Sequence, residues 1–347
     1  MTVQTNAFAR AGLLGNPSDG YFGKTVSVIV RNYSAQVTCR PSAHLTIEPS
    51  RQDNRTFASI DALADEVARY GYYGGVRLIK AAIKRFAQTC RQRGIGLNGR
   101  NFTITYDSDI PVRVGLAGSS AIITAVVRAL MAFYGVELPR PLVPSLVLDA
   151  ETRELGIAAG LQDRVIQTYE GVVYMDFDQQ KMQAQGHGDY EPLSPQMLPS
   201  MFIAHHSTLA EGTEVPHNDI RDRFDRGDRN VHDAMRQFAR LAREGRDLIV
   251  SGRGGQIGPL MDENFELRRR ITAISDGNLR MVQIGRGHGA AVKFAGSGGA
   301  VVGVYDGDPK RLDRIRADYK AFGAEVFVPQ VGSSAAIRCH HQEHEGH

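Results

Sequence analysis

Apolar positions along the chain follow two different periods. In residues 75–93 they recur three and four positions apart, which places them on one face of a helix. Residues 102–106 alternate as in a half-buried strand, and the β-branched run 25–31 predicts another strand. The same patterns predict further helices at 60–69, from about 120 to 134, and at 141–155, 219–251 with a break near 227, 259–275 and 310–322. Further strands are predicted at 36–39, 44–47, 171–177, 201–204, 290–295, 300–305 and 324–328.

The order of these elements indicates a fold class and a division of the chain. Helices and strands are mixed without strict βαβ alternation, so we expect an α+β fold rather than a doubly wound parallel sheet. A length of 347 residues is typical of two domains, and the polar stretch 179–199 with its three prolines is typical of a connection. We therefore expect domains at 1–185 and 186–332. The histidine-rich tail 333–347 is expected to be disordered, with a metal site there as the less favoured alternative.

Composition and charge exclude several classes of protein. Lys plus Arg number 41 and Asp plus Glu 38, a net charge of +3 that gives little reason to expect a nucleic-acid partner. The longest apolar stretch, 121–133, is interrupted by Arg128 and is too short for a membrane span. The first nine residues do not resemble a secretory signal, and the three cysteines are widely spaced. We expect a cytoplasmic protein without a nucleic-acid or membrane partner.

A loop rich in glycine and serine, residues 111–121, precedes the apolar helix that ends near 134. Gly115 and Gly118 allow the backbone to approach a bulky ligand, and the helix N-terminus favours an anion. The hydroxyls of Ser119 and Ser120 are suited to a phosphate or to Mg²⁺. An ordinary turn with a serine N-cap remains the alternative. The loop is not a Walker A motif, because no lysine follows the glycines.

Two other loops have compositions suited to binding. Residues 293–300 carry three glycines between two predicted strands, which is typical of a hairpin turn and also of close approach to a ligand. Residues 10–20 contain the Asn, Pro, Ser, Asp and Gly of a turn, flanked by Arg10 and Lys24. Two cations beside a small polar loop suit a sugar or a phosphoryl group.

Taken in order over nearly 300 residues, these three segments resemble the GHMP kinase superfamily, named for galactokinase, homoserine kinase, mevalonate kinase and phosphomevalonate kinase. The matching patterns are R-x-x-L-x-G-x-x-x-D, P-x-x-x-G-L-x-S-S-A and K-x-x-G-x-G-G, although the second is one residue longer here. Within the superfamily, residues 9–25, 72–78, 261–270 and 293–302 are similar to the glucuronokinases. Residues 205–217 differ from the plant members and are expected to lie near the acceptor.

The resemblance implies a two-domain α+β GHMP kinase fold, with mixed sheets packed against helices and the active site between the domains. It implies ATP and Mg²⁺ as cofactors and phosphoryl transfer to the anomeric hydroxyl of a sugar or sugar acid, with D-glucuronate expected. One alternative keeps the fold but changes the acceptor to another sugar, a heptose phosphate or a mevalonate-type alcohol. Another is a non-catalytic sugar or nucleotide binder on the same fold. A homodimer is possible.

The resemblance also implies roles for two carboxylates. The pattern A-E-x-x-x-x-G-x-x-x-G-x-x-D matches residues 150–163, with Glu151 as metal ligand and Asp163 as the group that accepts or polarises the acceptor proton. Ser119 or Ser120 would complete the metal shell, and the resemblance favours Ser120. Spacing alone favours a solvated helix face for Glu151 and a helix N-terminal position for Asp163.

The remaining site residues follow from the same resemblance. Arg10 is the expected catalytic cation near the transferred phosphoryl group. The residues expected to hold ATP are Pro111, Gly115, Leu116, Ala117, Gly118, Ser119, Ser120 and Ala121. Those expected to hold the sugar are Asn16, Asp19, Lys24, Gly296, Ser297 and Gly298. A uronate carboxylate needs a cation, for which Arg77 and Lys24 are candidates, and Tyr72 and Tyr73 are either sugar-stacking or core aromatics.

Overall fold

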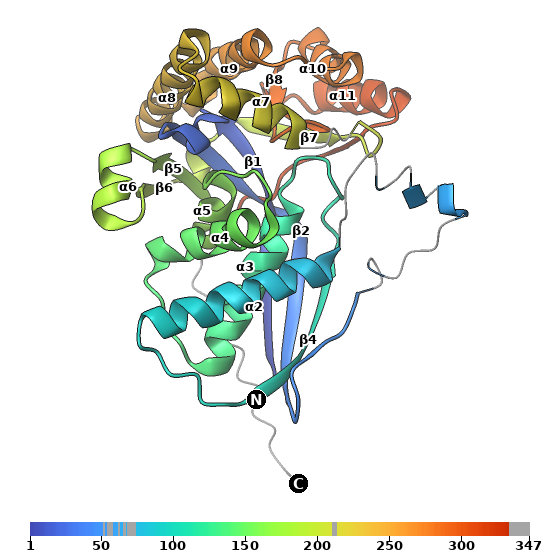
Figure 1. Cartoon of the computed structure of the whole chain (residues 1–347). Helices are drawn as coiled ribbons and strands as arrows, with labels where there is room; N and C mark the ends of the chain where they lie inside the picture. The colour runs from blue at the N-terminus through green and yellow to red at the C-terminus, as the bar shows by residue number, and fades with distance from the viewer. Residues whose placement is uncertain are drawn as a thin grey trace.

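The computed structural model describes residues 1–50, 53, 58–61, 63–64, 67, 74–209 and 214–332, and of residues 214–218 the backbone only. Within these residues two sheets are covered by helices (Figure 1). The α+β expectation is therefore confirmed. Tyr72, Tyr73 and the tail 333–347 lie outside the described residues, as does half of the helix predicted at 60–69. No helix in the described part of the chain is long and apolar enough to cross a membrane.

The first sheet is built around one long strand. Its members are β1 (Val3–Leu14), β2 (Lys24–Ser42), β3 (Thr46–Ile47), β4 (Asn101–Ser108), β5 (Val172–Asp176) and β6 (Asp189–Leu193). The order is β3-β4-β2-β5-β6, with β1 also paired to β2, and only the β3–β4 pair is parallel. Residues 26–30 of β2 are all buried, which fits a strand covered on both faces.

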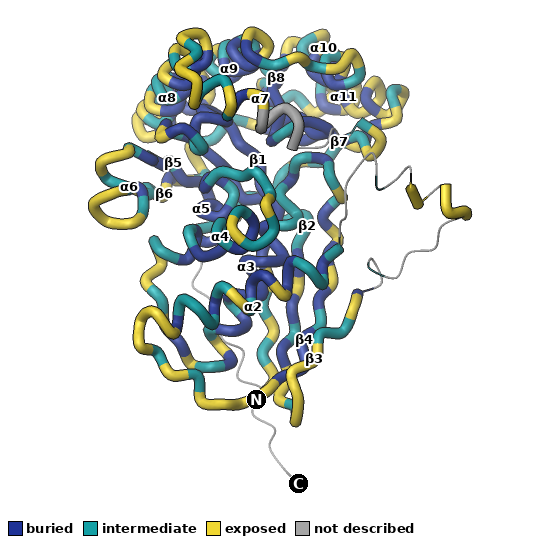
Figure 2. Tube along the Cα trace, viewed as in Figure 1, coloured by how far each residue is buried: buried dark blue, intermediate teal, exposed yellow. Residues whose placement is uncertain are grey.

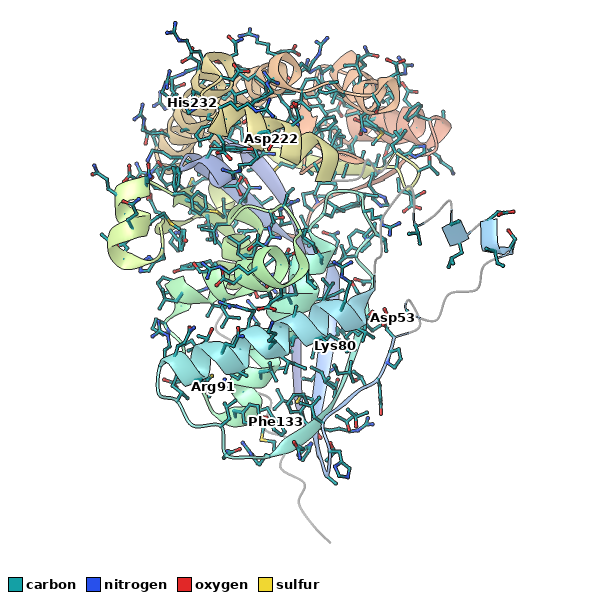
Figure 3. All side chains as sticks on the ribbon, in the orientation of Figure 1. Asp53, Lys80, Arg91, Phe133, Asp222 and His232 are labelled. Carbon is teal, nitrogen blue, oxygen red and sulfur yellow. The ribbon has the colours of Figure 1, made fainter. Side chains whose placement is uncertain are left out.

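Four helices cover this sheet: α2 (Gly75–Gln92), α3 (Gly118–Tyr134), α4 (Val143–Leu155) and α5 (Gln162–Tyr169). Helix α3 is apolar almost all round and contacts β1, β2 and the other three helices, as a central core helix does. Figure 3 shows the contrast with its neighbour: Lys80 and Arg91 are exposed on α2, whereas Phe133 of α3 is buried. The buried position of α3 fixes its N-terminus in place.

The second sheet has the order β10-β7-β9-β8 and is antiparallel throughout. Its strands are β7 (Ser200–His205), β8 (Ala291–Phe294), β9 (Ala300–Tyr305) and β10 (Glu325–Phe327). The helices in this part of the chain are α7 (Glu214–Asp225), α8 (Arg229–Val250), α9 (Gly258–Ile271), α10 (Asp276–Gly287) and α11 (Pro309–Ala321). Helices α9, α10 and α11 contact the second sheet, whereas α8 packs against β2 of the first sheet. One apolar cluster contains Leu14, Ala242 and Val302, so the core runs from one sheet into the other (Figure 2).

Several predicted elements need correction. Arg10 was expected in a loop, but it lies on β1, a strand that was not predicted. Small alanines at positions 7, 9 and 11 give β1 a weak strand pattern, and its pairing with β2 from Val3 to Leu14 stabilises it instead. The two short strands expected at 25–31 and 36–39 form the single strand β2. Helix α10 was also missed.

The expected connection 179–199 has regular structure of its own. It contains α6 (Gln179–Gln185) and β6, and β6 pairs with β5 in the first sheet. The edge of the first sheet therefore extends past residue 185. The division into two domains at that residue stays a prediction.

Candidate active site

A cavity of about 480 Å³ lies where segments far apart in sequence meet. They include the turn after β1, the loop before α3 and the hairpin turn between β8 and β9. The predicted site residues that line the cavity are Arg10, Asn16, Asp19, Pro111, Gly115, Leu116, Ala117, Gly118, Ser119, Glu151, Asp163, Gly296 and Ser297. The predicted site residues that do not line it are Lys24, Ser120, Ala121 and Gly298.

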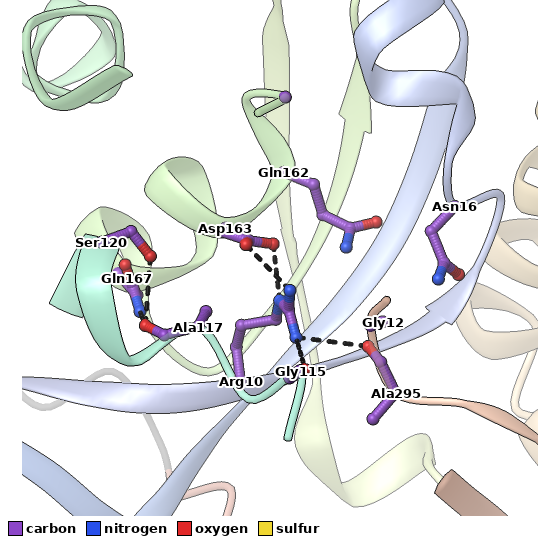
Figure 4. A network of polar contacts seen from close by, with 12 residues as sticks. Arg10, Gly12, Asn16, Gly115, Ala117, Ser120, Gln162, Asp163, Gln167 and Ala295 are labelled. Carbon is purple, nitrogen blue, oxygen red and sulfur yellow. Dashed lines mark hydrogen bonds and ion pairs between the residues drawn. The ribbon is translucent and has the colours of Figure 1, made fainter. Parts of the chain in front are cut away.

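Arg10 and Asp163 form a two-pronged ion pair at the centre of this arrangement (Figure 4). Nε of Arg10 lies 2.5 Å from Oδ1 of Asp163, and Nη2 lies 2.8 Å from Oδ2. Nη1 donates to the carbonyl of Gly115 at 2.5 Å and to that of Ala295 at 3.3 Å. Only 6% of Arg10 is exposed. One buried guanidinium thus ties the carboxylate to both glycine-rich loops.

The environment of Asp163 keeps its carboxyl group ionised. Burial acts to raise the pKa of Asp163, but the positive charges of Arg10 and Arg164 outweigh it, so the pKa lies below the ordinary 3.8. Asp163 opens helix α5, where the helix dipole also favours a negative charge. The carboxylate is therefore charged at neutral pH.

Glu151, fully buried on α4, is held by two partners. Ser119 Oγ donates to its Oε1 at 2.9 Å, and Arg164 donates to its Oε2 from Nε at 2.7 Å and also from Nη2. Ser120 is fully buried and donates instead to the carbonyl of Ala117 at 3.1 Å (Figure 4). The structure thus brings Ser119 to Glu151, where the resemblance favoured Ser120.

Asp19 caps the start of helix α5 as well as lining the cavity. Its Oδ2 accepts a hydrogen bond from the backbone N–H of Gln162 at 3.1 Å, which satisfies one free donor at the start of α5. Burial and the nearby charge of Asp163 raise the pKa of Asp19 to about 6. A Cβ at position 160 would lie 2.0 Å from this carboxylate oxygen, so Gly160 is required for the approach.

The two glycine-rich loops contact each other directly. A Cβ on Gly296 would lie 2.3 Å from the carbonyl oxygen of Gly115, and one on Gly115 would lie 2.7 Å from that of Gly298. Gly115 also has φ of +74°, which favours glycine. The glycines are therefore needed for loop-to-loop packing. Beyond them, Ala117 gives the first turn of α3 no side-chain cap, so its free N–H groups favour an anion.

Lys293 of the third motif is buried, with 1% of its surface exposed. Its Nζ donates to the carbonyl of Gly12 at 2.7 Å, to Oδ1 of Asn16 at 2.7 Å and to the carbonyl of Phe294 at 2.8 Å. Burial holds the pKa of Lys293 well below its usual range, and the charges of Arg268 and Arg10 add to that effect. The lysine thus positions Asn16 at the cavity.

The two basic residues expected to bind a substrate carboxylate have other partners. Nζ of Lys24 lies 2.5 Å from Oδ2 of Asp176, and Arg77 donates to the carbonyl of Leu155 at 3.5 Å. Neither lines the cavity. The arginines that do, among the described residues, are Arg10, Arg113, Arg164, Arg221 and Arg268. Arg113 and Arg268 fall in segments already singled out by their motifs, whereas Arg164 and Arg221 had no signal of their own.

Comparison with known proteins gives consistent matches. Residues 77–171 match the family described as GHMP kinases N-terminal domain. The chain is 39% identical over 338 residues to glucuronokinase 1 of Arabidopsis thaliana, covering 96% of this chain and 93% of that protein. It is 40% identical over 343 residues to probable glucuronokinase 2 of the same plant, with coverage of 96% and 93%.

Solved structures show the same fold at lower sequence identity. Galactokinase of Lactococcus lactis, solved in complex with galactose, aligns with a TM-score of 0.73 and 15% identity over 96% of this chain and 94% of that one. The two plant relatives extend the likeness from the matched central region to the first and third motifs. Because that similarity covers nearly the whole length of both proteins, the chain belongs to the GHMP kinase family.

Proposed function

We propose that this protein transfers the γ-phosphoryl group of ATP to the anomeric hydroxyl of D-glucuronate, giving D-glucuronate 1-phosphate and ADP. The observation that carries the proposal is the buried Arg10–Asp163 pair, which joins a charged carboxylate to both glycine-rich loops in one cavity. Near-full-length similarity to two proteins named as glucuronokinases supports the choice of acceptor.

The nucleotide phosphates would lie at the first turn of α3. The free N–H groups of that turn and the positive end of the helix dipole stabilise negative charge there. Pro111, Gly115 and Gly118 line the same part of the cavity, where glycine leaves room for the phosphates beside the backbone. We therefore assign the loop 111–121 to ATP, as the resemblance implies.

Glu151 and Ser119 are the residues that fit Mg²⁺. Both offer oxygen atoms, which this cation prefers, and they lie 2.9 Å apart at the cavity wall. Oε2 of Glu151 is bound by Arg164, which leaves Oε1 as the available ligand. No group of three His, Cys, Asp or Glu among the described residues is arranged around a metal position, which suits a cation held partly by phosphates. Bound Mg²⁺ would neutralise phosphate charge.

Asp163 and Arg10 act on the reacting atoms. The sugar O1 forms a bond to the γ-phosphorus, the bond from that phosphorus to the ADP oxygen breaks, and the O1 proton passes to Asp163. Because the pKa of Asp163 is lowered by its two arginines, the carboxylate is a weak base that accepts the proton late in the step. Its main contribution is to orient the hydroxyl, and Arg10 supplies positive charge beside the transferring group.

An acceptor assay tests the proposal. We expect ADP release from Mg-ATP to be strongest with D-glucuronate and weaker with galactose, galacturonate or mevalonate. Turnover with a different acceptor would keep the kinase activity and reject glucuronate. Absence of turnover with all four acceptors, together with failure to bind ATP, would reject the proposed function entirely.

A further inference from the structure

We propose that Arg221 recognises the carboxylate of the sugar acid, and therefore sets the preference for a uronate over a neutral sugar. This inference rests on the proposed function. The cavity is lined by five arginines and three carboxylates among the described residues, so it carries a surplus of positive charge. An acidic substrate needs one of those cations to be free of other carboxylates.

Four of the five arginines bind other protein groups or lie in the loop assigned to ATP. Arg10 is paired with Asp163, and Arg164 is paired with Glu151. Arg268 is buried and donates to the carbonyls of Gly296 and Ser297 at 2.9 Å each, which fixes the hairpin loop. Arg113 belongs to the loop 111–121 that we assign to ATP.

Arg221 differs from these four in its surroundings. It lies on α7, and its Nη2 donates to the carbonyl of Gly20 at 2.5 Å. Its guanidinium carbon sits 4.3 Å from the centre of the Tyr21 ring, a cation–π contact that fixes the plane of the group. No carboxylate of the described residues forms an ion pair with it: on α7, Asp219 pairs with Arg223, and Asp222 pairs with Arg226 in the turn after the helix.

The remaining donors of Arg221 suit a carboxylate. A guanidinium has five N–H groups, and the bond to Gly20 uses one of them. A planar guanidinium held against an aromatic ring can offer two parallel N–H groups to both oxygens of a carboxylate. Gly20 and Tyr21 are next to Asp19 in the turn expected to hold the sugar, so Arg221 lies at the sugar end of the cavity.

Helix α7 also begins in a part of the sequence that we expect near the acceptor. It begins at Glu214, which lies inside that segment, residues 205–217. An arginine on this helix reaches the turn after β1, across a separation of 201 residues. The specificity for the acceptor would thus be set by an element outside the three family motifs.

The test compares D-glucuronate with D-glucuronamide, in which an amide replaces the carboxylate and the ring is unchanged. We expect Arg221→Gln to lower kcat/KM for glucuronate by about 100-fold, mainly through KM, because a charge-assisted pair is lost. The kcat/KM for glucuronamide and the KM for ATP should be unchanged. Arg221→Lys, which keeps the charge but not the planar fork, should give an intermediate loss.

Arg226→Gln is the matched control, because Arg226 lies in the turn directly after α7, is mostly exposed and has Asp222 as its ion-pair partner. Its kinetics should equal those of the wild type. An equal loss with both acceptors in Arg221→Gln would show a structural role and overturn the inference, and so would unchanged kinetics with glucuronate. A wild-type protein that does not phosphorylate glucuronate would reject the proposed function first, and the inference with it. If Arg221→Gln does not fold, Arg221→Lys decides between these outcomes.

Discussion

At the scale of single residues, Asp163 depends on two arginines that reach it from different directions. Arg10 comes from the middle of β1 and Arg164 is its own neighbour on α5. Arg164 also binds Glu151, so the two carboxylates proposed for proton and metal are joined through one cation. Charge at one of these positions therefore affects the other.

Replacing Asp163 by Asn tests its role in phosphoryl transfer. The amide keeps the size of the side chain but loses the charge and the capacity to accept a proton. We expect kcat to fall by about 10²–10⁴-fold while ATP binding is retained. Steady-state ADP release and calorimetric titration with ATP measure the two effects. Asp149→Asn, on α4 and outside the cavity, serves as control. A fall of less than a few-fold would contradict the assignment of Asp163.

Asp19 gives the protein a pH dependence of known sign. Its pKa is raised from 3.8 to about 6 in the folded protein, so the folded state binds this proton more tightly than the unfolded state. Between these two values the free energy of unfolding decreases as the pH rises. Above about 6 the folded protein carries the full cost of the buried charge.

Asp19→Asn should remove that cost while keeping an acceptor for the N–H of Gln162. We expect the variant to be as stable as the wild type near pH 4 and more stable at pH 7, with a melting temperature higher by about 2–4 °C. Thermal unfolding of both proteins across this pH range measures the difference. A constant offset at every pH would show that burial of the Asp19 charge is not the cause.

At the scale of elements, the site depends on two loops that pack against each other. Gly296 has no room for a side chain, because its Cβ would meet the carbonyl of Gly115 and Nη1 of Arg10 at 2.3 and 2.8 Å. A backbone oxygen moves only with its whole loop. The pattern of three glycines in the hairpin therefore reflects the neighbouring loop as much as any ligand.

Gly296→Ala should displace the loop before α3 and the Arg10 guanidinium together. We expect a loss of about 1–3 kcal/mol in the free energy of unfolding and a fall of about 100-fold in kcat/KM, because both reactants are positioned by these loops. Denaturant unfolding measures the loss in the free energy of unfolding, and ADP release measures the fall in kcat/KM. Gly96→Ala is the control, since no atom lies within 4 Å of its added Cβ. Equal behaviour of the two variants would contradict the loop contact.

At the scale of the whole molecule, the cavity exists because the two sheets share one core. Lys293 on β8 of the second sheet donates to Gly12 on β1 of the first, and Asn264 of α9 accepts from the N–H of Gly15 at 2.7 Å. These bonds hold the end of β1 and the turn after it against the second sheet. The sugar-binding turn is therefore positioned by residues more than 240 positions away in the chain.

The sequence by itself determined the α+β class, most helices, and the three segments that line the cavity. It could do so because helical periodicity and glycine-rich turns are local properties of the chain. Arg10, Glu151 and Asp163 were found through the resemblance of their motifs to those of the GHMP kinases, and all three line the cavity. The acceptor, like the roles of these residues, stays a proposal.

Tertiary structure alone decided the rest. β1 has a weak pattern of its own and becomes a strand by pairing with β2. The choice of Ser119 over Ser120 depends on which hydroxyl faces α4, and the places of Lys24, Arg164 and Arg221 depend on elements that meet only in the fold. Local patterns indicate most of the elements that form, whereas the partner of a charged side chain is fixed by burial and by contacts between distant segments.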